Sequence, residues 1–176
     1  SKISKIVRDD LKEVTSLAEK LVPLNDEDIV IDIAGNDNTL LRSYSRPVWD
    51  GKHGIRKWSC DPAENLANEA RQGVNEHFVG LWNADEFLKW SGGEKASVIT
   101  SCAVLYHSED PCRFALDVSR CLAPNGVWII EASYLGSMLE NFAADSVGHE
   151  HLLHLRLADI ERIIKGTGLK IVDAWL

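Results

Sequence analysis

Short apolar segments alternate with amphipathic segments along most of this sequence. The apolar segments predict strands at 28–34, 57–61, 77–82, 95–105, 126–134 and 169–176. Between them, apolar side chains at helical spacing predict helices at 38–44, 62–72, 85–90, 111–122, 135–144 and 157–165. Several of the strands are apolar throughout, which is typical of strands covered on both faces. Because such an alternation requires right-handed crossovers, we expect an α/β fold with a doubly wound, mostly parallel sheet and helices on both faces.

An amphipathic segment precedes the first strand. Residues 2–22 carry apolar side chains at helical spacing and end just before Pro23, so we expect a leading helix there. The chain of 176 residues has the length of one domain, and we predict that residues 1–176 form a single domain. No window contains the roughly 20 apolar residues of a membrane-spanning helix. We therefore expect no membrane partner.

Charge and cysteine content exclude further classes. Nineteen basic and 27 acidic side chains give a formal charge of −8, which has the wrong sign for binding a phosphate backbone, so we expect no nucleic-acid partner. The four cysteines are far apart and form no C-x-x-C pair, which argues against a zinc knuckle and a disulfide framework. They indicate reduced thiols in a cytoplasmic protein, and the simplest structural role for all four is that of small buried hydrophobic residues.

Polar side chains follow four of the predicted strands, where such sheets bind their ligands. Asp32 lies near the end of the first strand and is followed by the turn at 34–37, Asp61 ends the second strand, Trp82 ends the third, and His107 follows the fourth. Because the carboxyl ends of parallel strands meet at one edge of a sheet, we expect these residues to converge. The pattern favours a nucleotide-type ligand.

Two of these strand ends have a structural alternative. Asp61 can accept hydrogen bonds from both hydroxyls of a ribose, but Asp61 and Pro62 could instead begin the next helix. Trp82 offers a flat apolar face beside Asn83, an arrangement suited to an adenine ring, but it could instead belong to the core.

The turn in "IDIAGNDNTLL" contains a single glycine, Gly35. A dinucleotide would require G-x-G-x-x-G to bring the backbone against a pyrophosphate. S-adenosylmethionine has no phosphate, so one glycine with small neighbours can suffice for close approach of the backbone. This turn is therefore poor for a dinucleotide and acceptable for S-adenosylmethionine.

Four stretches carry a resemblance to a known family: "IVIDIAGNDNTLL", "CDPAENLANEA", "ASVITSCAVLYHSEDPCRFALDVSRCLAPNGVWIIEASYL" and "FAADSVGHEHLLHL". They resemble class I S-adenosylmethionine-dependent methyltransferases, and specifically the branch that C-methylates nucleotide-linked keto-deoxysugars. The likeness covers about residues 17–176 and implies a Rossmann-like methyltransferase sheet, S-adenosylmethionine as cofactor and a small-molecule substrate such as a sugar nucleotide. The strand-end pattern and the resemblance together predict a cofactor site made of Asp32, Ala34, Gly35, Asn36, Asp61, Pro62, Trp82, Asn83 and Cys102.

The resemblance also implies catalytic residues. The catalytic Glu-His pair of this branch matches Glu150 and His151, with the histidine as base, and its histidine after the fourth strand matches His107. Methylation of a carbon beside a ketone requires a base to remove a C–H proton, and histidine titrates near neutrality. Glu150 would serve the substrate rather than orient His151, because neighbouring side chains diverge. His149 and His151 lack a third metal ligand, so we predict no metal site; a loop without a role is the remaining alternative.

The sequence also departs from this family. Ala34 and Asn38 stand where its members usually have glycine, and no cysteine or histidine cluster before Asp32 supplies the family's zinc-binding region. The family's carboxyl-terminal portion also has no counterpart after the sixth predicted strand. These departures keep two alternatives open: a non-catalytic methyltransferase-like binding domain, and a methyltransferase that acts on oxygen or nitrogen of another small molecule.

Overall fold

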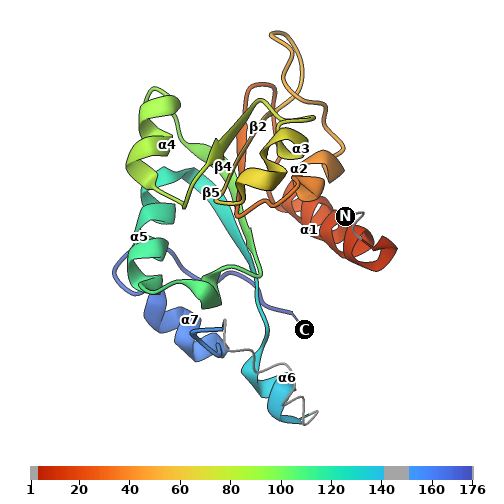
Figure 1. Ribbon diagram of the computed structural model, residues 1–176. Helices are drawn as coiled ribbons and strands as arrows, with labels where there is room; N and C mark the ends of the chain where they lie inside the picture. Colours follow the sequence, from red (N-terminus) through yellow and green to blue (C-terminus); the bar gives the residue numbers. More distant parts are fainter. Residues whose placement is uncertain (1–3, 141–150, 176) are drawn as a thin grey trace.

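A five-stranded parallel sheet forms the centre of the computed structural model, which describes residues 4–140 and 151–175 (Figure 1). Its strands are β1 (Ile29–Ile33), β2 (Arg56–Asp61), β3 (Glu76–Val79), β4 (Ala96–Cys102) and β5 (Leu122–Glu131). They lie in the order β3-β2-β1-β4-β5, and every neighbouring pair is parallel. The chain therefore crosses from one half of the sheet to the other between β3 and β4, and the strand order reverses between β1 and β4. This is the place where doubly wound sheets bind ligands.

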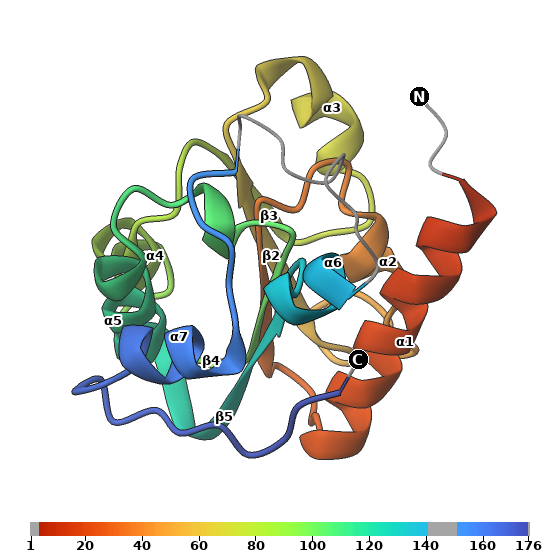
Figure 2. The ribbon, with the colours of Figure 1, turned by 90° about the horizontal axis from the view of Figure 1, so that it is seen from below.

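Helices cover both faces of the sheet (Figures 1 and 2). On one side lie α1 (Lys5–Leu21), α2 (Thr39–Ser43) and α3 (Ala67–Ala70), the last preceded by a short 3₁₀ turn, η1 (Glu64–Leu66). On the other lie α4 (Ala84–Trp90) and α5 (Pro111–Cys121), with α7 (Leu157–Ile163) packed against α5. A second 3₁₀ turn, η2 (Leu105–His107), follows β4, and α6 (Leu135–Glu140) follows β5.

The alternation of side chains along β1 builds a core on each face of the sheet. All five residues of β1 are buried, as its uninterrupted apolar sequence predicts for a strand covered on both sides. Ile31 packs on one face with Trp58 and Phe87, under α4 and α5. Val30 packs on the other face with Leu41, under α1 and α2. Asp32 follows in the same alternation and points to the α1 and α2 face at the end of the strand.

The predicted fold is confirmed, including the doubly wound, mostly parallel sheet with helices on both faces. The sixth strand predicted at 169–176 is wrong, because residues 169–175 form no strand. Leu169 and Ile171 nevertheless pack against the cluster around Ile163 and Ile164. Val172 and Trp175 of the same segment are exposed, so only part of its apolar pattern is buried. The predicted helix at 62–72 is divided into η1 and α3. Residues 141–144 of the helix predicted at 135–144 lie outside the described residues.

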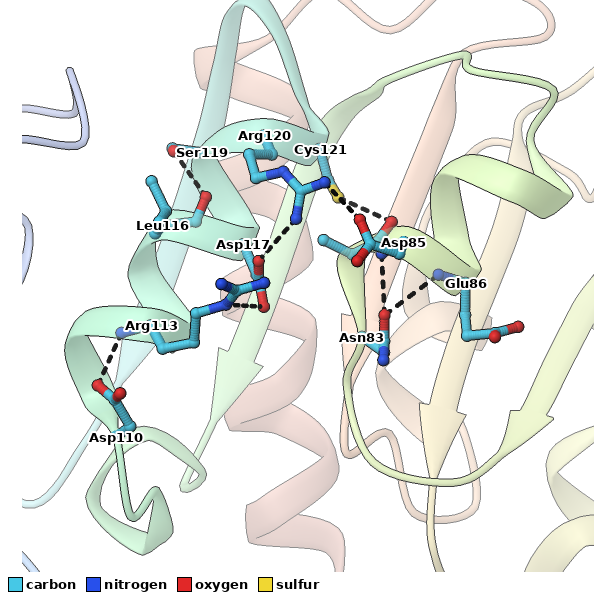
Figure 3. A network of polar contacts seen from close by, with 11 residues as sticks. Asn83, Asp85, Glu86, Asp110, Arg113, Leu116, Asp117, Ser119, Arg120 and Cys121 are labelled. Atoms are coloured by element: carbon cyan, nitrogen blue, oxygen red, sulfur yellow. Dashed lines mark hydrogen bonds and ion pairs between the residues drawn. The ribbon is translucent and has the colours of Figure 1, made fainter.

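A network of charged side chains joins α4 to α5 (Figure 3). Asp117 of α5 is almost buried and accepts hydrogen bonds from Arg113 at 3.0 Å and from Arg120 at 3.1 Å. Arg120 also pairs with Asp85 in the first turn of α4. The network holds the two helices side by side.

Within residues 4–140 and 151–175, no helix combines the length and the hydropathy needed to cross a membrane.

Candidate active site

The turn after β1 has an unusual backbone for its sequence. Ala34, Asn36 and Asn38 all have positive φ angles, of 56°, 54° and 63°. Gly35 does not, although it is the only glycine in the turn. Its role is to leave space, because a Cβ atom on Gly35 would lie 2.3 Å from Asn38 Oδ1. The turn therefore uses glycine for a close approach and places non-glycine residues in the left-handed region.

Asp61 connects this turn to the segment after β2. Its Oδ2 accepts a hydrogen bond from the Asn36 amide at 2.9 Å, and its Oδ1 accepts one from the Ala63 amide at 2.8 Å. The side chain is largely buried. Each carboxylate oxygen can accept a second hydrogen bond, so both oxygens can still bind a ligand hydroxyl. Pro62 lies between these two contacts, at the start of the segment that leads into η1.

Asp32 lies beneath the turn with 4% of its surface exposed. Its Oδ1 is 2.6 Å from the Thr100 hydroxyl of β4, the strand paired with β1 on the other side of the order reversal. Cys102, two residues further along β4, is half-buried at the strand end. Burial raises the pKa of its thiol, and the negative charges of Asp32 and Glu131 act in the same direction. Asp32 and Cys102 therefore approach the reversal point from adjacent strands.

Asn38 is a buried residue of the turn that sequence reasoning treated only as a lost glycine. It is fully buried, and its Nδ2 donates to Ser59 Oγ and to the Ala70 carbonyl, each at 2.7 Å. Ser59 is in turn hydrogen-bonded to His77 Nδ1 at 2.8 Å. Asn38 Oδ1 is buried and accepts no hydrogen bond within the described part of the chain. No signal in the sequence distinguishes this buried asparagine from a solvent-exposed turn residue, because Asn is common in both.

Trp82 and Asn83, the two predicted cofactor contacts after β3, have different surroundings. The Trp82 ring lies 6.1 Å from the Phe87 ring, packs against the core beneath α4, and has a buried Nε1 without a partner among the described residues. Asn83 Oδ1 accepts hydrogen bonds from the amides of Asp85 at 2.9 Å and Glu86 at 3.2 Å, and so caps α4 (Figure 3). Asn83 thus uses its side-chain oxygen to cap the helix, and its Nδ2 group takes no part in the cap.

Two of the predicted catalytic residues come together in space. His107 ends η2 after β4, while His151 lies 44 positions later in the chain, and their ring centroids are 5.2 Å apart. Tyr106 lies against both rings, at 4.6 Å from His107 and 4.4 Å from His151. The Leu153 amide donates to the Tyr106 carbonyl at 3.1 Å, which connects the two segments. Glu150, the third predicted catalytic residue, lies outside the described residues, and the His, Cys, Asp and Glu side chains that are described form no group of three able to hold a metal.

Comparison with known sequences identifies the family. A family model described as a methyltransferase domain matches residues 6–174. C-methyltransferase NovU of Streptomyces niveus is 27% identical over 165 residues, which make up 93% of this chain and 38% of NovU. The chain therefore spans well under half the length of this curated relative.

Comparison with solved structures supports the same fold. Magnesium protoporphyrin IX methyltransferase (ChlM) from Synechocystis, solved with bound SAH, has a TM-score of 0.64 at 13% identity, over 96% of this chain and 78% of that one. An S-adenosylmethionine-dependent methyltransferase from Clostridium acetobutylicum has a TM-score of 0.62 at 15% identity, over 98% and 83% of the two chains. Together with the family match over almost the whole sequence, these likenesses show that the chain belongs to the methyltransferase domain family and has the class I fold that uses S-adenosylmethionine as cofactor.

Proposed function

We propose that this chain binds S-adenosylmethionine at the ends of β1, β2 and β3 and that it C-methylates a small molecule, a nucleotide-linked keto-sugar. The observation that carries the catalytic part is the contact between His107, which ends η2 after β4, and His151, which lies after α6 in the chain. Two imidazoles gathered beside a methyl-donor site suit a reaction that begins with proton removal. NovU, the curated relative, is named a C-methyltransferase, which supports transfer to carbon.

The residues at the strand ends fit the cofactor by their chemistry. Asp61 presents two acceptor oxygens to the hydroxyls of a ribose, and Asn83 offers an N–H donor to a ring nitrogen of adenine. Gly35 lets the backbone pass close over Asp32, where a side chain would collide with Asn38. The cofactor supplies the methyl group as an electrophile.

His151 is the base in this proposal. A ring nitrogen of His151 takes the proton from the carbon beside the ketone, and the electron pair of that C–H bond is then available to form the new C–C bond. Tyr106 and His107 pack against the His151 ring, so its orientation is set before substrate arrives. Glu150 would contact a hydroxyl group of the substrate.

Cofactor binding is tested by calorimetry with S-adenosylhomocysteine. We expect a dissociation constant in the micromolar range, and a loss of roughly 1.5–3 kcal/mol in Asp61→Ala, the worth of hydrogen bonds to a charged group. Asp61 also holds the turn, so the 2′-deoxy analogue serves as a control: if Asp61 contacts the ribose, the two losses will not add. Absence of binding by the parent chain would contradict the proposed site.

Catalysis is tested by proton exchange, which needs no methyl transfer. With a 4-keto sugar nucleotide in heavy water, the parent protein should introduce deuterium at the carbon beside the ketone. His151→Ala should slow this exchange by ~10² to 10⁴, the usual effect of losing a general base, and change cofactor affinity less than about twofold. His53→Ala is the matched control, because His53 is exposed and pairs with Asp26 far from the site in sequence and fold. Equal exchange in His151→Ala and the parent would remove His151 from the mechanism.

An acceptor other than a keto-sugar would give a different result. If the parent binds cofactor but catalyses no exchange, C–H deprotonation is not the first step with this substrate. A methyltransferase acting on oxygen or nitrogen, or a domain that binds cofactor without catalysis, would then account for the strand-end residues better.

A further inference from the structure

A single hydroxyl proton is shared between two acceptors beneath the turn after β1. Thr100 Oγ1 lies 2.6 Å from Asp32 Oδ1 and 3.1 Å from the Ile31 carbonyl oxygen, and both side chains are buried. If Asp32 is ionised, both contacts compete for the one Thr100 proton. If Asp32 carries a proton, its carboxyl group donates to Thr100, Thr100 donates to Ile31, and both contacts are satisfied. The geometry therefore favours a protonated Asp32.

The surroundings of Asp32 are rich in acceptors. A Cβ atom on Gly35 would lie 2.3 Å from Asn38 Oδ1 and 3.2 Å from Asp32 Oδ2, so both oxygens flank the same backbone atom. Asn38 Oδ1 is buried without a donor among the described residues. Asp61 adds the charge of a second carboxylate nearby. A buried carboxylate needs a proton or an opposite charge, and the described residues around Asp32 supply only the proton.

None of the described titratable groups that interact with Asp32 carries a positive charge at pH 7. Tyr44 at the end of α2, Cys60 of β2 and Cys102 of β4 each interact with Asp32, and burial raises the pKa of all three. Lys57 of β2 lies on the same face, but its ammonium group is over the Tyr44 ring, 5.8 Å from the ring centroid. The negative charge of Glu19 of α1 acts to raise the pKa of both Lys57 and Tyr44.

These surroundings also act on the titration of Asp32. Burial raises the pKa of Asp32 to about 7, and the negative charge of Asp61 acts in the same direction. A hydrogen bond donated by Thr100 to the ionised carboxylate acts against both.

We propose that Asp32 is a specificity-determining residue for the cationic methionine half of the cofactor: it carries a proton in the free protein and releases that proton when the cation binds. The inference rests on the proposed cofactor site. A cation beside Asp32 replaces the proton as the partner of the carboxylate, and Thr100 then donates its hydrogen to Asp32. Binding is thereby coupled to proton release, and neutral adenosine derivatives are disfavoured because they leave the proton in place.

The coupling determines how affinity depends on pH. Below pH 7 the cofactor must displace a bound proton, so affinity falls by up to tenfold for each pH unit as the pH decreases. Above pH 7 Asp32 is already ionised in the free protein, and affinity becomes independent of this group.

Calorimetry in two buffers with different ionisation enthalpies measures the released proton directly. For S-adenosylmethionine and S-adenosylhomocysteine we expect release of ~0.5 proton per molecule bound at pH 7, approaching one at pH 6. 5′-Methylthioadenosine carries neither the ammonium nor the sulfonium group and should release none. Release by both charged ligands would assign the contact to the ammonium group, and release by S-adenosylmethionine alone would assign it to the sulfonium. Equal release by methylthioadenosine would overturn the proposal.

One variant isolates Asp32 from other titrating groups. Asp32→Asn keeps the shape and should bind without proton release, with affinity constant from pH 6 to 8. Binding by the parent without proton release at pH 6 would contradict the inference alone, whereas no binding at any pH would contradict the cofactor site itself.

Discussion

The three left-handed residues of the turn after β1 differ in how readily they adopt that backbone. Asparagine is one of the few side chains found there regularly, because its short amide group can hydrogen-bond nearby. Asn36 and Asn38 are thus suited to their φ angles, and Asn38 gains two buried hydrogen bonds from its position. Ala34 has no such compensation. Its Cβ approaches the following carbonyl oxygen and stores strain of about 1 kcal/mol.

Replacing Ala34 by glycine should relieve this strain. We expect Ala34→Gly to raise the free energy of unfolding by about 0.5–1 kcal/mol and to tighten cofactor binding, because the backbone can approach the ligand more closely. Ala63→Gly is the matched control: Ala63 has a φ of −75°, so glycine there only loosens the unfolded chain and should destabilise. Urea denaturation measures both effects. A loss of stability in Ala34→Gly would mean that the turn has another backbone geometry.

Asp32 should make stability depend on pH. Because burial raises the pKa of Asp32 to about 7 from its ordinary 3.8, the folded chain holds one proton more than the unfolded chain between those values. The free energy of unfolding contributed by this group therefore falls as the pH rises, by up to about 1.4 kcal/mol per pH unit, until about pH 7.

The measurement compares parent and Asp32→Asn by urea denaturation from pH 5 to pH 8. Relative to the variant, the parent should lose stability across this range. The comparison removes the contribution of His77, which is the same in both proteins. Burial and Arg71 lower the pKa of His77, so its contribution to the free energy of unfolding rises with pH. A constant difference between parent and variant would mean that Asp32 is ionised in the folded chain throughout.

At the scale of single elements, the start of α4 shows how one residue serves both the fold and the site. Asn83 Oδ1 caps the helix through the amides of Asp85 and Glu86, which leaves only the Nδ2 group for a ligand. A helix of seven residues depends on its cap, because nucleation is unfavourable and little else satisfies its first amides.

Substitutions at Asn83 can separate these two roles. Asn83→Ala should cost about 1 kcal/mol of stability through loss of the cap, whereas Asn83→Asp keeps a capping oxygen and should be neutral. Both variants lose the Nδ2 donor, so both should bind S-adenosylhomocysteine more weakly. Unchanged affinity in Asn83→Asp, measured by calorimetry, would show that this amide makes no contact with the cofactor.

At the scale of the whole molecule, the strands of the sheet differ in how well they are shielded from solvent. β1 and β4 lie at its centre and are almost entirely buried, while β3 is at an edge and is partly exposed along its length. Amides of β1 and β4 should exchange with solvent only on global unfolding, and those of β3 by local opening. Native-state hydrogen exchange followed by NMR tests this order, and S-adenosylhomocysteine should slow exchange in both groups. Faster exchange in β1 than in β3 would contradict the sheet order.

Local patterns in the sequence were sufficient to predict most of the architecture. Apolar runs and helical spacing depend only on neighbours in the chain, and right-handed crossovers then leave few ways to arrange the strands. The acid near the end of β1, the acid that ends β2 and the histidine after β4 could likewise be placed at strand ends, because parallel strands bring those ends to one edge. Family and cofactor followed from the same short segments.

Tertiary structure decided what those segments do. Residues 169–175 have a strand-like pattern but form no strand, and pairing cannot be deduced from one segment. Whether Trp82 faces the cofactor or the core, and whether Asn38 is buried, depends on the neighbouring elements that cover them. The contact between His107 and His151 joins segments far apart in the sequence, so only the folded chain determines their distance. Local preference sets the elements, and burial among distant neighbours sets the environment that gives a side chain such as Asp32 its chemistry.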